Sequence, residues 1–133
     1  MNRFISIASA MVITISLAGC TLGPKSYGKV SDLKSAYVSA GGECQGSTVL
    51  DTSSISSASP ILKGMSGISC TKDIGMFVFP SQKARDYMID LIDGAATASK
   101  TGIHMVIGPN WLIGGTGLDT KKFAPALGGT ARY

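Results

Sequence analysis

The sequence has 133 residues, 44% of them apolar and 15% charged, which suits one small folded domain and excludes a disordered chain. The formal net charge of +4 arises from 12 basic and 8 acidic residues, without the basic cluster typical of nucleic-acid binding. We therefore expect a single domain with no nucleic-acid partner.

The first 19 residues have the organisation of a secretory signal peptide. Arg3 gives a positive start, and residues 4–17 form an apolar stretch. As a helix this stretch would span about 21 Å, less than the roughly 30 Å hydrocarbon core of a bilayer. The pattern therefore predicts a cleaved export signal over residues 1–19 rather than a membrane span or a buried helix.

The end of this segment, Leu17-Ala18-Gly19-Cys20, resembles the lipobox of bacterial lipoproteins. The resemblance implies that Cys20 carries a diacylglyceryl group and that signal peptidase recognises Leu17, Ala18 and Gly19 and cuts before Cys20. Acyl chains hold a small domain firmly on a bilayer. We therefore expect the protein on the extracytoplasmic face of the cell membrane, with residues 20–29 as a lipidated, flexible tether.

The folded domain is expected over residues 30–133, starting with a helix at 31–40 capped by Ser31. The helix is predicted from an apolar stripe of Leu33, Ala36, Tyr37 and Ala40. Residues 44–50 favour a strand, and the serine-rich residues 51–60 favour a polar loop.

Cys44 and Cys70 remain as an even pair once Cys20 is assigned to lipid. In an exported chain such a pair predicts a structural disulfide. A metal site would need about four nitrogen or sulfur ligands, and the chain adds only one histidine. The cysteines also lack the C-x-x-C spacing of a redox pair. We therefore predict one disulfide, no metal and no cofactor.

The middle of the chain predicts a hairpin followed by a long helix. Residues 67–71 and 74–79 favour two strands joined by a turn at Lys72-Asp73. Residues 81–96 carry an apolar stripe at helical spacing, which predicts a helix lying on a sheet. Its other face carries Asp86, Asp90 and Asp93, which we interpret as a solvated face rather than a cation site.

The last third of the chain predicts strands at 103–107 and 111–113 and a helix over 118–127 that ends at Gly128-Gly129. The residues between the strands, 108–110, form either a hairpin turn or a bulge within one long strand. The complete order predicts an α+β fold: a two-layer sandwich with a four- or five-stranded, mainly antiparallel sheet and helices on one face.

Few residues are candidates for chemistry. His104 is the only histidine, and no G-x-S-x-G nucleophile elbow accompanies it. The glycine-rich residues 114–117 lack the lysine of a phosphate-binding loop and indicate a flexible turn. Trp111 is either a core residue with a satisfied indole N–H or an exposed contact for a partner. In the second case, Pro109, Asn110 and Trp111 form a partner-binding stretch.

The mature chain also resembles small, mostly uncharacterised lipoproteins of Gram-positive actinobacteria over about residues 30–129. The matching features are Cys44 and Cys70, Met76 to Phe79, Ala84 to Ile92, Ile107 to Trp111, and Leu127 to Gly129. The serine-rich loop and Pro125 depart from that pattern. The resemblance brings no catalytic residues.

The function expected from the sequence is that of a non-enzymatic surface lipoprotein that binds a protein or another cell-envelope component. The loops at 108–117 and 51–60 are its expected contact surfaces. A prophage-encoded lipoprotein that excludes related phages is one version of this function. The alternative is an envelope enzyme, or an enzyme accessory, that uses His104 as a base.

Overall fold

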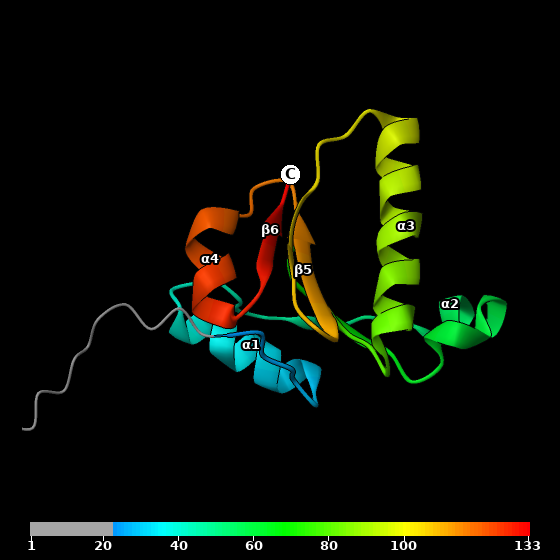
Figure 1. The fold of residues 1–133 in the computed structure, drawn as a ribbon, viewed down its shortest axis with the longest axis horizontal. Helices are drawn as coiled ribbons and strands as arrows, with labels where there is room; N and C mark the ends of the chain where they lie inside the picture. The colour runs from blue at the N-terminus through cyan, green and yellow to red at the C-terminus, as the bar shows by residue number, and fades with distance from the viewer. Residues whose placement is uncertain (1–22) are drawn as a thin grey trace, which may run out of the picture.

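The computed structural model describes residues 23–133, which form an α+β fold around one six-stranded antiparallel sheet (Figure 1). The strand order is β1-β2-β3-β5-β4-β6. The strands are β1 (Thr48–Val49), β2 (Ser66–Thr71), β3 (Ile74–Val78), β4 (His104–Ile107), β5 (Trp111–Gly115) and β6 (Thr130–Arg132). The helices are α1 (Val30–Ser39), α2 (Ser53–Ala58), α3 (Gln82–Ser99) and α4 (Thr120–Leu127), with a 3₁₀ turn η1 (Pro60–Leu62).

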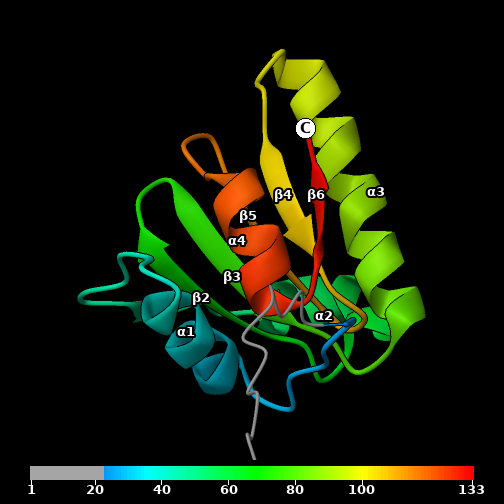
Figure 2. The same ribbon diagram turned by 60° about the vertical axis from the view of Figure 1, so that its left-hand side comes forward.

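Helices cover both faces of the sheet, so the prediction of helices on one face is wrong (Figures 1 and 2). Met76 and Val78 of β3 pack in a core cluster with residues of α1 and α4. Phe79, which follows β3, and the half-buried Phe77 belong to a second cluster with residues of α3 and η1. Successive strand residues point to opposite faces, so a strand that is apolar on both needs a cover on each side.

Two hairpins build the centre of the sheet. β2 and β3 pair antiparallel across Lys72 and Asp73, as predicted. β4 and β5 also pair antiparallel, with Ile107 opposite Leu112. The backbone N–H of Gly108 donates to the carbonyl oxygen of Trp111 at 2.9 Å and closes the turn. Of the two alternatives for residues 108–110, the hairpin turn is therefore the one observed.

The edges of the sheet differ from the predicted elements. The strand expected at 44–50 is only the two-residue β1, and the expected loop at 51–60 contains α2 and leads into η1. β6 was not predicted, because Gly128 and Gly129 mark the end of α4 and only three residues follow them in the strand. Gly128 takes the left-handed conformation (φ 71°) that turns the chain back along β4. The sheet therefore has six strands instead of four or five.

The predicted disulfide between Cys44 and Cys70 is confirmed. It links the segment before β1 to β2, and both cysteines are buried in the core cluster under α1 and α4. The bond therefore links the segment that leads into the edge strand β1 to the neighbouring strand β2.

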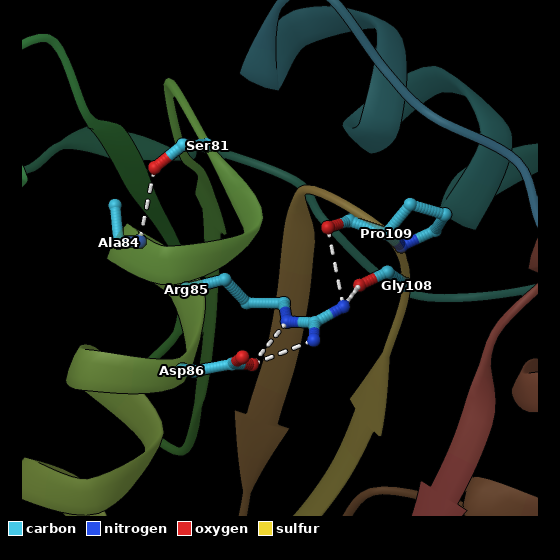
Figure 3. Close-up of polar contacts among 6 residues, drawn as sticks. All are labelled: Ser81, Ala84, Arg85, Asp86, Gly108 and Pro109. Atoms are coloured by element: carbon cyan, nitrogen blue, oxygen red, sulfur yellow. Dashed lines mark hydrogen bonds and ion pairs between the residues drawn. The ribbon is translucent and has the colours of Figure 1, made fainter.

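Ser81 caps the longest helix. Its side-chain oxygen accepts a hydrogen bond from the backbone N–H of Ala84 at 3.1 Å (Figure 3). We expect Ser81→Ala to lower the free energy of unfolding by about 1 kcal/mol, because this N–H loses its acceptor. Urea unfolding followed by circular dichroism measures the loss. The control is Ser99→Ala at the exposed other end of α3, where a change within about 0.5 kcal/mol is expected. Equal losses in the two variants would refute the capping role.

Candidate functional site

Trp111 lies at the end of the β4–β5 turn and is fully buried. Its indole N–H donates to the carbonyl oxygen of Lys25 at 2.6 Å. The ring of Tyr27 packs against the indole edge-on, with 5.5 Å between the centroids. Trp111 is therefore a core residue with a satisfied indole N–H, and it faces the start of the folded chain rather than a partner.

The N-terminal strap, residues 24–27, is fastened to this turn. The backbone N–H of Tyr27 donates to Oδ1 of Asn110 at 3.1 Å, and Nδ2 of Asn110 donates to the carbonyl oxygen of Tyr27 at 2.7 Å. The N–H of Lys25 donates to the carbonyl oxygen of Gly128 at 3.2 Å. The strap therefore packs against the domain, although it belongs to the segment 20–29 that the sequence predicts as a flexible tether.

Close backbone contact holds the strap against the end of α4. A Cβ on Gly128 would lie 2.6 Å from the carbonyl oxygen of Gly23, so a side chain there would displace the strap. The hydroxyl of Tyr27 donates to the carbonyl oxygen of Leu127 at 3.3 Å. Burial raises the pKa of Tyr27, which keeps this hydroxyl protonated and able to donate.

Arg85 connects α3 to the same turn (Figure 3). Its Nη1 donates to the carbonyl oxygens of Gly108 at 2.5 Å and Pro109 at 3.1 Å. Nε and Nη2 bind a carboxylate oxygen of Asp86 at 2.9 and 2.6 Å. Pro109 and Asn110 are thus only partly exposed and are engaged within the domain. The turn thus makes an internal junction within the domain, and partner binding by this stretch stays a prediction.

A cleft of about 630 Å³ with a mixed polar and apolar lining opens beside Arg85. Pro24 of the strap, Gln82 of α3, Gly108 and Arg132 are among its lining residues.

Arg132 donates to the carboxylate of Asp93 at 2.5 Å. Asp86 and Asp93 therefore pair with arginines, which agrees with the interpretation of this helix face as solvated. In residues 23–133 no three His, Cys, Asp or Glu side chains are grouped to hold a metal ion.

His104 lies at the start of β4, opposite Gly115 of β5. Its imidazole packs edge-on against the ring of Tyr133, with 5.8 Å between the centroids. In the described part of the chain its side chain has no hydrogen bond or ion pair with a carboxylate or hydroxyl. In the described residues, therefore, no acid or nucleophile is hydrogen-bonded to His104.

An apolar groove of about 370 Å³ opens on the α3 side of the sheet. Carbon atoms form most of its wall, and its apolar lining residues are Ile55, Phe77, Met88, Ile92, Ile103 and Leu112. The other lining residues are Lys72, Asp73, Thr101, Gly114, Gly115 and Thr116. The groove thus joins residues from both loops that the sequence marked as contact surfaces, 51–60 and 108–117.

The groove itself was not predicted. Met88, Ile92 and Phe77 belong to apolar patterns that indicate buried positions, and the sequence does not show that they are only partly covered. Gly114 gave a usable signal, because a strand residue without a side chain leaves the sheet surface above it open. Gly115 is required for another reason: a Cβ there would lie 2.1 Å from the carbonyl oxygen of Asp73.

Cys20 and the rest of the lipobox, Leu17 to Gly19, lie outside the described residues. Among residues 23–133, none of the helices has the length and apolar character needed to cross a bilayer. Comparison with protein-family models, curated proteins and solved structures found no match to the chain.

Proposed function

We propose that the protein is a lipoprotein anchored to the cell membrane through Cys20, whose folded domain is a non-enzymatic binding module. In this proposal the apolar groove receives an apolar side chain of a protein partner in the cell envelope. A prophage-encoded lipoprotein that excludes related phages is a specific form of the same proposal.

The observation that carries the proposal is the groove. Its wall is apolar and open to solvent, and Ile55 at its rim is 39% exposed. A concave apolar site that stays open in the folded domain is the usual receptor for a buried anchor residue of a partner. The contacts of His104, by comparison, add no support to the alternative of an envelope enzyme.

The anchor is tested with Cys20→Ala, which removes the thiol that would carry the lipid. We expect the variant to lose acyl labelling and either to leave the membrane fraction or to stay unprocessed. Metabolic labelling with a fatty-acid analogue and membrane sedimentation measure this. Cys20→Ser is a second variant with a side chain of similar size and no thiol, and it should behave in the same way. A cleaved protein that remains on the membrane without Cys20 would contradict the proposal.

The groove is tested by photo-crosslinking on intact cells from a photoreactive residue at position 55. The control position is Val38, which is 47% exposed on α1, across the sheet from the groove. We expect a discrete protein adduct from position 55 and none from position 38.

A groove-filling variant makes this test specific. A Cβ at Gly114 would lie in ordinary contact, 3.6 Å from side-chain atoms of Leu112 and Met105, so Gly114→Leu can extend its side chain into the groove. We expect this change to abolish the adduct from position 55. Gly117→Leu, at a position open to solvent, should leave the adduct unchanged. An adduct that survives the filling of the groove would rule out the groove as the binding site.

A further inference from the structure

We propose that one end of the domain, the end where the N-terminal strap begins, docks on the anionic lipid surface of the membrane that holds the anchor. We call this the proximal end; it consists of the strap, residues 28–29 up to the N-cap of α1, the 108–110 turn, the first turn of α3 and Gly128. This inference rests on the proposed lipidation of Cys20 and adds an orientation and a second contact with the membrane.

The covalent distance between anchor and strap is short. Five residue steps separate Cys20 from Lys25, which gives at most about 18 Å when fully extended. Lys25 is hydrogen-bonded to the domain through its own N–H and through its carbonyl oxygen. With an acylated Cys20 at the headgroups, the proximal end cannot move farther from the membrane than this distance. By contrast, α3 alone is about 27 Å long, so its two ends are farther apart than the extended tether can span.

The charge of the proximal end suits anionic headgroups. Lys25, Lys29 and Lys83 are exposed there, in the strap, at the N-cap of α1 and in the first turn of α3. The carboxylate of Asp86 is already paired with Arg85, and Asp32 in α1 is the other acidic group nearby. Basic residues therefore exceed acidic ones at this end. Each lysine close to an anionic bilayer raises the ratio of docked to undocked domain about fivefold.

Docking in this orientation leaves the apolar groove accessible. One part of its lining, Lys72, Asp73 and residues 114–116, lies at the end of β3 and β5 away from Trp111. Figure 2 shows these turns at the end of the sheet opposite to the start of α3. This part of the groove would thus face away from the bilayer.

The test uses the mature, acylated protein, labelled with ¹⁵N, in nanodiscs that contain a phosphatidylglycerol and a nitroxide headgroup lipid. We expect strong paramagnetic broadening of amides in residues 24–29, 82–85 and 108–110 and little in residues 72–73 and 116–119. In phosphatidylcholine nanodiscs the ratio of docked to undocked domain should fall at least tenfold.

Matched charge reversals locate the contact. Lys25→Glu with Lys83→Glu should lower the docked ratio at least tenfold. Lys72→Glu with Lys121→Glu has the same effect on net charge, and Lys121 occupies the same second position in α4 that Lys83 occupies in α3. This control should leave the docked ratio within twofold of the unmodified protein. Unchanged amide spectra outside the substituted turns establish that each variant is folded.

The possible failures can be separated. If the acylated protein enters the nanodisc but its proximal amides are not broadened, or the distal ones are broadened instead, the docking inference is overturned and the anchor stands. If mass spectrometry finds no acyl group on Cys20, the proposed function fails, and the docking inference fails with it.

Discussion

Replacing Trp111 with alanine is expected to lower the free energy of unfolding by about 3–5 kcal/mol, the range for deleting a large buried aromatic side chain. Trp111 has no exposed surface, and its removal also leaves the carbonyl oxygen of Lys25 without its donor. Small domains are stable by only about 5–15 kcal/mol, so this loss takes a large part of the total. Because Trp111 is the only tryptophan, unfolding in urea must be followed by circular dichroism.

Two further variants separate the contributions of the indole. Trp111→Phe keeps most of the buried ring and removes the N–H, and we expect it to lose about 1–3 kcal/mol for the unsatisfied carbonyl. Tyr133→Ala removes an aromatic side chain that is 71% exposed and should change stability by less than about 0.5 kcal/mol. If Trp111→Ala were as mild as Tyr133→Ala, the indole would not be the core residue that the structure shows.

The second large effect is expected from the disulfide. Cys44→Ala combined with Cys70→Ala should lower the free energy of unfolding by about 3.5 kcal/mol, from the chain entropy of a loop closed across a separation of 26 residues. Denaturant unfolding of a Cys20→Ala protein measures the effect, because its only cysteines are then this pair.

Reduction provides the matched control. Dithiothreitol should destabilise the protein with the intact pair and should have no effect on the double alanine variant. Equal stability with and without the reductant in both proteins would show that the bond contributes nothing to folding. Mass spectrometry under non-reducing conditions should find the peptides of Cys44 and Cys70 joined.

Local patterns were sufficient for part of this fold. The helical spacing of apolar residues located α3, and the polar Lys72-Asp73 pair between two apolar runs located the β2–β3 hairpin. The disulfide was predicted from the even number of cysteines left after Cys20, in a chain expected to be exported. Each of these signals depends on neighbours in sequence or on composition, which a sequence contains directly.

Long-range contacts account for what the sequence did not show. The hydrogen bonds that fasten the strap join residues 83 and 86 positions apart, from Tyr27 to Asn110 and from Lys25 to Trp111. The strap itself has no apolar periodicity, so it looks like a linker until its partners are known. β6 is too short for a pattern, and the side of the sheet that each helix takes depends on how strands are ordered in space. The groove was missed because the partial exposure of Ile92, one of its lining residues, depends on which distant parts of the chain pack beside it.

The contact of one indole with both the strap and Gly129 has a consequence for biosynthesis. The carbonyl oxygen of Lys25 accepts from the indole N–H of Trp111, while Gly129 lies so close that a Cβ there would be 2.7 Å from the same ring. The core around Trp111 therefore cannot close until the chain is available as far as Gly129. Contacts between residues so far apart in sequence also slow folding. In a chain that crosses a translocation channel, this architecture delays closure of the core until Gly129 has passed.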